Sequence, residues 1–201
     1  MIPAERAHVS PSEPSRVAIR VDASAAIGYG HLTRCLALAL ALRDSGAEPT
    51  FLCARLPPEL QHDIEQQGFP LVQLPRTTSD ADHQSHPFLL DQDADSDAVA
   101  RALGEEKQQF DSVVVDHYGI DAIWERRMRQ WASVTAITDR ADRMHDVDVL
   151  LDQNLQDRSN RYDGLVPANC QLLLGPRFAL LRPEFAARRA GLARAHGQHS
   201  V

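Results

Sequence analysis

Lysine is nearly absent from this sequence. Lys107 is the only lysine among the 21 lysine and arginine residues, and it lies in the polar run from Gly104 to Gln109. Mechanisms that need a lysine, such as Schiff-base formation or a phosphate-binding P-loop, are therefore disfavoured. A net positive charge is also missing: the formal charge is -7 at pH 7. Because no overall positive field would attract nucleic acid or an anionic membrane, we expect neither as a partner.

Cysteine pairs and long apolar runs are missing as well. The three cysteines, Cys35, Cys53 and Cys170, are widely spaced and form no CxxC pair, which is typical of buried thiols in a reducing compartment. The first residues show no apolar signal region, and no apolar run approaches the ~20 residues of a membrane-spanning helix. We therefore interpret the protein as cytoplasmic.

Short apolar runs alternate with helical segments along most of the 201 residues. Residues 1–15 are rich in proline and polar side chains and are expected to form a loose tail. The polar segment 76–95 is expected to be a long loop. Strands are predicted at 17–22, 50–53, 71–74, 113–115, 134–137, 147–151 and 172–174. Helices are predicted at 31–45, 57–67, 121–131 and from Asp95 or Ser96 to 109.

This alternation predicts an α/β fold for residues 16–181. Strands that are separated by helices form right-handed crossovers, which give a parallel, Rossmann-like sheet with helices on both faces. In such a sheet, ligands bind beyond the carboxyl ends of the strands. Polar residues follow several of the predicted strands at this edge: Asp22, Ser24, Gly28, Tyr29, Gly30 and His31 after the first, Asp116, His117 and Tyr118 after the fourth, Asp139 after the fifth, and Asn154 after the sixth. Taken one at a time, such residues are equally typical of ordinary turns and helix caps.

The turn Gly28-Tyr29-Gly30 is the sharpest local signal. Two glycines allow a tight turn close to a ligand, and the helix start that follows favours a phosphate. The full GxGxxG pattern is absent because Thr33 occupies the third position, so a plain tight turn is an open alternative. His31 lies in the first helical turn, where the positive helix end favours the neutral imidazole that a general base needs. Arg34, one turn later, is placed to pair with the same phosphates or to form a surface ion pair.

A metal site is not expected. The candidate metal donors are Asp22, His31, Asp116, His117 and His145. They show no HxH or HExxH spacing. The sequence indicates no other cofactor.

Four ordered segments between Arg20 and Phe185 together resemble a known family. The segments are RVDASAAIGYGHLTRCLALALAL, VVVDHYGIDAIWE, ITDRADRMHDVDVLLDQNL and LLLGPRFALLRPEF. They resemble the UDP-2,4-diacetamido-2,4,6-trideoxy-β-L-altropyranose hydrolases of pseudaminic acid biosynthesis. The resemblance implies the amino-terminal half of a two-domain, GT-B-like fold. It also implies metal-independent hydrolysis of a UDP-sugar to UDP and the free sugar, with water attacking C1.

The resemblance also implies roles for individual residues. The catalytic histidine of the family follows the GxG turn, which here is His31. The sugar and phosphate contacts are expected from residues in the matching motifs and the glycine turn: Asp22, Ser24, Gly28, Tyr29, Gly30, Arg34, Asp116, His117, Tyr118 and Asn154.

Two departures from the family pattern affect the expectation. The family carries two adjacent acids and a leucine after the fifth strand, where this chain has Thr138-Asp139-Arg140. The second domain of the fold is expected to be missing, and residues 182–201 are expected to form a helix that leads toward it. A second domain or a separate chain would then be needed to complete the cleft, and the activity of this chain alone is expected to be impaired. Two alternatives stay open: a GT-B glycosyltransferase domain, and a non-catalytic domain that binds sugar nucleotides or another protein.

Overall fold

Seven strands form one parallel sheet in the spatial order β3-β2-β1-β4-β5-β6-β7. The computed structural model describes residues 14–105, 110–155 and 160–182. All neighbouring strands run parallel, which confirms the predicted Rossmann-like α/β sheet. The strands are β1 (Arg16–Val21), β2 (Glu48–Cys53), β3 (Leu71–Gln73), β4 (Ser112–Asp116), β5 (Ser133–Ile137), β6 (Val149–Asp152) and β7 (Gln171–Leu174).

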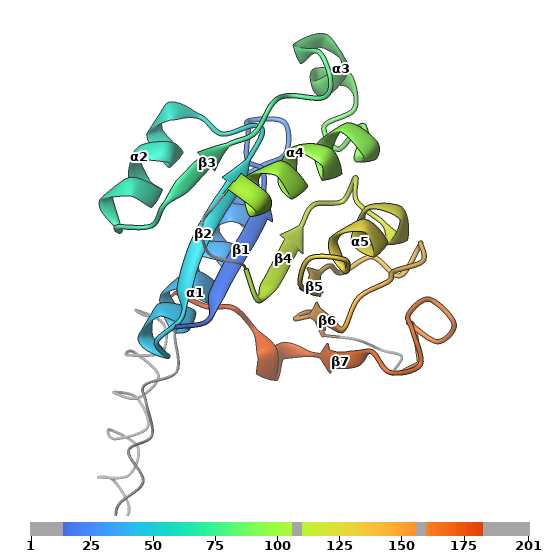
Figure 1. Cartoon of the computed structure of the whole chain (residues 1–201). Coiled ribbons are helices and arrows are strands. Elements are labelled where there is room, and N and C mark those ends of the chain that lie inside the picture. The colour runs from blue at the N-terminus through green and yellow to red at the C-terminus, as the bar shows by residue number, and fades with distance from the viewer. Residues whose placement is uncertain (1–13, 106–109, 156–159, 183–201) are drawn as a thin grey trace, which may run out of the picture.

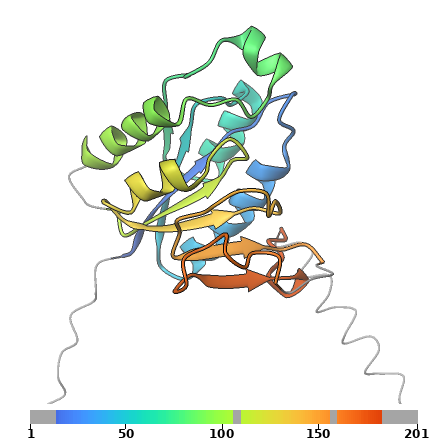
Figure 2. The same cartoon turned by 90° about the vertical axis from the view of Figure 1, so that its right-hand side faces the viewer.

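Helices cover both faces of the sheet (Figure 1). On one face, α1 (Gly30–Asp44) and α2 (Pro58–Gln66) close a core that contains Cys35 and Ile64. On the other face, α4 (Gln92–Glu105) and α5 (Ala122–Met128) close a core that contains Val99 and Trp124. Figure 2 shows α4 and α5 together on that second face. A short 3-10 turn, Pro176–Phe178, follows β7.

The strand order has its switch point between β1 and β4, and the carboxyl edge of the sheet at this point is called the β1–β4 crevice below. From β1 the chain continues to β2 on one side, whereas β4 lies on the other side and leads on to β5. Ligands of open parallel sheets bind at such a point, beyond the carboxyl ends of the strands. His31 follows β1 and Asp116 ends β4, so the fold brings these two predicted site residues to the same point.

The predicted loop at 76–95 is wrong in two places. Helix α3 (Asp80–Ser85) lies within it, beyond the end of the sheet toward which the strands run (Figure 1). Ser79 caps α3 by accepting a hydrogen bond from the Asp82 amide at 3.1 Å. Helix α4 starts at Gln92, and the Asp91 side chain accepts a hydrogen bond from the Ala94 amide at 3.0 Å. Asp95 is therefore an internal, fully buried residue of α4 rather than its cap.

Other predicted bounds differ by a few residues. The predicted strand 147–151 is β6, Val149–Asp152, and the predicted helix 121–131 is the shorter α5, which Asp121 caps at its start. Of the predicted tail, Pro14 and Ser15 are described, and the Ser15 carbonyl accepts a hydrogen bond from the Glu48 amide at 2.8 Å. Residues 1–13, Lys107 and the predicted helix beyond Arg182 lie outside the described residues.

Candidate functional site

His31 and Asp116 form a hydrogen-bonded pair at the β1–β4 crevice. Nδ1 of His31 lies 2.5 Å from Oδ1 of Asp116. His31 is in the first turn of α1, and Asp116 is the last residue of β4. Asp116 is fully buried and His31 is 8% exposed. A carboxylate at the base of the crevice therefore holds an imidazole whose remaining accessible surface is small.

Asp116 is also held by Arg34. The guanidinium donates from Nε to Oδ2 at 2.5 Å and from Nη2 to Oδ1 at 2.6 Å, a two-point contact that fixes the carboxylate plane. Burial alone would raise the pKa of Asp116, but the hydrogen bonds from Arg34 and His31 outweigh it and the pKa is lowered. The structure thus places Arg34 in a half-buried ion pair with Asp116 rather than in a surface ion pair, and a phosphate contact of Arg34 stays a prediction.

The ionised Asp116 determines which nitrogen of His31 is free. A carboxylate can only accept, so the 2.5 Å contact requires a proton on Nδ1, and in the neutral ring the lone pair is then on Nε2. This is the tautomer of a general base that another residue orients. Cys35 donates its thiol to Asp116 Oδ2 at 3.6 Å, and burial raises the pKa of that thiol, so Cys35 is not an activated nucleophile.

Aromatic side chains border His31. The Tyr118 ring meets the imidazole of His31 edge-on, with ring centroids 4.7 Å apart. The centroid of the Phe88 ring lies 5.8 Å from the centroid of the imidazole. Phe88 comes from the segment that contains α3, and it also contacts Tyr118 at 4.9 Å. That segment fits because residue 119 is glycine: a Cβ on Gly119 would overlap the Phe88 carbonyl oxygen. The 76–91 segment therefore forms part of the wall around the imidazole.

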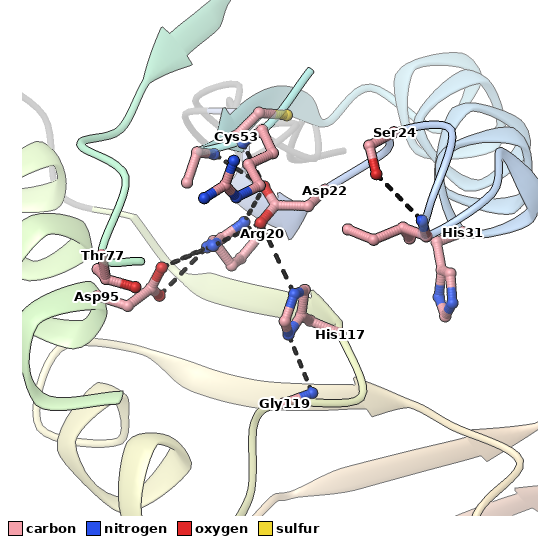
Figure 3. Close-up of polar contacts among 12 residues, drawn as sticks. Arg20, Asp22, Ser24, His31, Cys53, Thr77, Asp95, His117 and Gly119 are labelled. Atoms are coloured by element: carbon pink, nitrogen blue, oxygen red, sulfur yellow. Dashed lines mark hydrogen bonds and ion pairs between the residues drawn. The ribbon is translucent and has the colours of Figure 1, made fainter. Parts of the chain in front are cut away.

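Asp22 lies in a buried charged cluster beside this site, as Figure 3 shows. Its Oδ1 accepts from Arg20 at 2.6 Å and from the Ala54 amide at 2.8 Å. Arg20 also binds Asp95 of α4 at 2.6 Å. Burial alone would raise the pKa of Asp22, but the attraction of Arg20 and His117 outweighs it and lowers the pKa to about 2. Asp22 is thus a fully engaged carboxylate that ties the ends of β1 and β2 together.

His117 connects the cluster to the loop after β4. Its Nδ1 accepts a hydrogen bond from the Gly119 amide at 3.0 Å, and its Nε2 lies 3.7 Å from Oδ2 of Asp22 (Figure 3). Burial lowers the pKa of His117 to about 4, and the attraction of Asp22 opposes this only in part. His117 is therefore a neutral buried ring that carries its proton on Nε2, toward Asp22.

The turn before α1 is built around Ser24 and Gly28. Gly28 has a φ of 85°, in the left-handed region that favours glycine, and its amide donates to the Ser24 carbonyl at 2.8 Å. The Ser24 hydroxyl contacts Nε2 of His83 in α3 at 2.8 Å. Tyr29 precedes α1 without capping it through its side chain, and amides at the start of a helix favour an anion. The Tyr29 ring is half exposed and lines a cavity of about 370 Å³ between α1 and α2.

Tyr118 and Asn154 meet at Asp139, across the ends of β4, β5 and β6. The Tyr118 hydroxyl donates to Oδ1 of Asp139 at 2.6 Å, and Nδ2 of Asn154 donates to Oδ2 at 3.0 Å. Asp139 is the single acid of the segment Thr138-Asp139-Arg140.

The metal donors considered from the sequence are divided between separate partners. His31 pairs with Asp116, His117 faces Asp22, and His145 binds Glu125 through Nδ1 at 2.7 Å. Within residues 14–105, 110–155 and 160–182, no three His, Cys, Asp or Glu side chains gather as a metal site requires. In the same ranges, no helix has the length and apolar character needed to cross a bilayer.

Sequence reasoning missed three residues that shape the site. Phe88 and His83 fall in the segment that the sequence predicts as a loop, and Gly119 belongs to no predicted site. Phe88 is the only Phe, Trp or Tyr in the polar run 76–95, which is a usable signal for a buried contact. Nothing local marks Gly119, because its role depends on the segment that packs against it from elsewhere in the chain.

Comparison with known proteins agrees with these observations. No protein-family model matches the chain. The chain is 29% identical over 171 residues, 85% of its length, to the UDP-2,4-diacetamido-2,4,6-trideoxy-beta-L-altropyranose hydrolase of Campylobacter jejuni subsp. jejuni serotype O:2, and it spans about half (53%) of that protein. A crystal structure of Acinetobacter baumannii MurG matches 81% of this chain and 45% of its own, with a TM-score of 0.52 and 16% identity. The resemblance that the four motifs indicated is therefore confirmed, and the Rossmann-like sheet is the α/β fold of this GT-B glycosyltransferase structure.

Proposed function

We propose that the chain carries the catalytic histidine of a UDP-sugar hydrolase. The substrate would be UDP-2,4-diacetamido-2,4,6-trideoxy-β-L-altropyranose, cleaved to UDP and the free sugar in pseudaminic acid biosynthesis. The observation that carries the proposal is the 2.5 Å contact between Nδ1 of His31 and Asp116 at the start of α1. The name of the Campylobacter relative supplies the substrate, and the MurG likeness supports the fold alone.

The geometry supports one simple reaction. Nε2 of His31 takes a proton from water as the water oxygen forms a bond to C1 of the sugar. The bond between C1 and the phosphate oxygen breaks, and its electron pair leaves with UDP. The amides at the start of α1 face the negative charge that develops on the departing diphosphate. The step uses neither lysine nor a metal ion, so we expect activity to persist after exhaustive chelation.

Other predicted contacts divide into two groups. Ser24, Gly28, Tyr29, Gly30, Tyr118 and Asn154 follow β1, β4 and β6 at the carboxyl edge of the sheet and are proposed to contact the sugar or the diphosphate. Asp22, Asp116 and His117 are buried and paired within the protein, so their proposed role is to hold the crevice in shape. Arg34 acts through Asp116 in the same way.

The matched region spans 53% of the relative. We therefore propose that a second domain or a separate chain completes the cleft and contributes to UDP binding. We also propose that the enzyme acts in the cytoplasm, where UDP-sugars are made and used.

The test is UDP release from this substrate in 18O-labelled water, with chromatography and mass spectrometry of both products. The wild-type chain is assayed alone and mixed with the carboxyl-terminal half of the Campylobacter relative. Label in the free sugar and none in UDP is the expected result, because water attacks C1. His31→Ala should slow the reaction about 10²- to 10⁴-fold. His62→Ala, which removes an exposed histidine of α2, should not.

Three results would overturn the proposal. The first is no UDP release in either assay. The second is release by His31→Ala at nearly the wild-type rate. The third is product that forms only when a sugar acceptor is added, which would identify a glycosyltransferase.

A further inference from the structure

Asp139 joins two side chains from neighbouring strand ends. It follows β5, whereas Tyr118 follows β4 and Asn154 follows β6. One carboxylate oxygen accepts from the Tyr118 hydroxyl at 2.6 Å, and the other accepts from Nδ2 of Asn154 at 3.0 Å. The backbone carbonyl of Asp139 accepts from Arg161 at 2.6 Å. The carboxylate thus sits on a fixed backbone between two residues predicted to touch the substrate.

These hydrogen bonds have a fixed direction. Because a carboxylate only accepts, Tyr118 must donate its single proton to Asp139, and Asn154 must turn its amide nitrogen toward it. The phenol oxygen of Tyr118 and Oδ1 of Asn154 then remain as acceptors. Burial, reinforced by Asp139, raises the pKa of Tyr118 to about 12, so the phenol stays protonated near neutral pH. Tyr118 is therefore not a proton acceptor in its own right.

Tyr118 in turn borders the proposed base. Its ring packs edge-on against His31 at 4.7 Å and against Phe88 at 4.9 Å. The Arg140 guanidinium lies 5.4 Å from the centroid of the Tyr118 ring. A change in the direction of the Tyr118 hydroxyl would shift a ring that forms one side of the His31 pocket.

We propose that Asp139 is a positioning residue, which fixes two hydrogen-bond acceptors: Tyr118, which lies beside His31, and Asn154. The acceptors suit a substrate that presents N–H groups, as a diacetamido sugar does. The kinetic part of this inference rests on the proposed hydrolase function. The single acid of the Thr138-Asp139-Arg140 segment is sufficient for the role, since one carboxylate serves both partners.

The first test is spectroscopic and needs no activity. Tyrosinate absorbance is read within seconds of a pH jump, and the difference from Tyr118→Phe isolates Tyr118 from Tyr29 and Tyr162. In Asp139→Asn the pKa of Tyr118 should fall by about one pH unit, because a negative charge and an acceptor are lost while burial remains. Asp163→Asn, which removes an exposed carboxylate, should leave it unchanged. An unchanged Tyr118 pKa in Asp139→Asn would overturn the proposal.

The second test is a double-mutant cycle on UDP release. Asp139→Asn should lower kcat about tenfold, and the same change should lower kcat less in a Tyr118→Phe background, because the part that acts through Tyr118 is already lost. Thermal unfolding of each variant verifies that the fold is retained. Additive effects on kcat would show that Asp139 does not act through Tyr118. Absence of UDP release from wild-type protein would contradict the proposed function. The pKa measurement would still show whether Asp139 holds the Tyr118 hydroxyl.

Discussion

Gly119 and Phe88 are packed backbone against backbone. A Cβ on Gly119 would overlap the Phe88 carbonyl oxygen and lie 2.9 Å from Cε1 of His117. The contact joins the loop after β4 to the segment after α3, which are separate in the sequence and meet over the crevice. It therefore places Phe88 against His31, and residue 119 has no space for any side chain.

Gly119→Ala should displace the Phe88 segment. We expect it to lower the free energy of unfolding by about 1–3 kcal/mol, the usual cost of forcing an extra carbon into a packed site. Gly104→Ala is the matched control, because a Cβ there meets open space within α4 and should stabilise the protein by about 0.5–1 kcal/mol. Urea denaturation of both variants measures the difference. Equal free energies of unfolding for the two variants would show that Gly119 and Phe88 are not in contact in solution.

Asp116→Asn should lower the rate of hydrolysis strongly while the protein stays folded. Asparagine presents one acceptor where the carboxylate accepts from Arg34 and His31 together, so the tautomer and orientation of His31 are no longer fixed. We expect kcat to fall about 10²- to 10⁴-fold with a smaller change in KM. Steady-state kinetics on UDP release measure this. A change confined to KM would show that Asp116 serves substrate binding alone.

Much of the fold could be predicted from local pattern. Most strands contain a short run of apolar residues, and this local pattern can be recognised without knowledge of contacts. Helix α3 could not be predicted in this way, because its sequence DADHQS has no apolar periodicity. Contacts from distant parts of the chain hold it, Ser24 to His83 and Arg55 to Asp80 among them.

The candidate site was predictable in its members and not in its pairings. His31 and Asp116 were both expected at the carboxyl edge of the sheet, but they are 85 residues apart in sequence and nothing local joins them. The sequence predicts a phosphate near Arg34, because this residue follows a glycine turn. The structure directs it to Asp116, since a buried carboxylate requires a compensating charge. The same requirement joins Arg20 to Asp95, over 75 residues.

The protein should lose stability as the pH falls from about 6.5 to about 4. Burial lowers the pKa of His117 from 6.5 to about 4, against the attraction of Asp22 and Asp95 and with some repulsion from Arg20 and His31. Between pH 6.5 and about 4, the imidazole of His117 is protonated in the unfolded chain and neutral in the folded chain. The free energy of unfolding should therefore fall by about 1.4 kcal/mol per pH unit for the one proton.

Comparison with His117→Gln isolates this effect. Burial also lowers the pKa of His83, so both proteins should share a residual slope from that residue. Urea denaturation between pH 7 and pH 4 should give a flatter profile for the variant. Parallel profiles would show that His117 is already protonated in the folded protein, or exposed.

Arg20→Leu should be among the most destabilising single changes in the sheet. The Arg20 side chain is fully buried and neutralises two carboxylates, Asp22 at 2.6 Å and Asp95 at 2.6 Å. Leucine would leave both without a counter-charge, at a cost of about 3–5 kcal/mol. The pKa of Asp22 should also rise from about 2, so that unfolding in acid begins at a higher pH. Arg101→Leu, on the exposed side of α4, should change the free energy of unfolding by less than about 0.5 kcal/mol, and equal losses in the two variants would contradict a supporting role for the buried cluster.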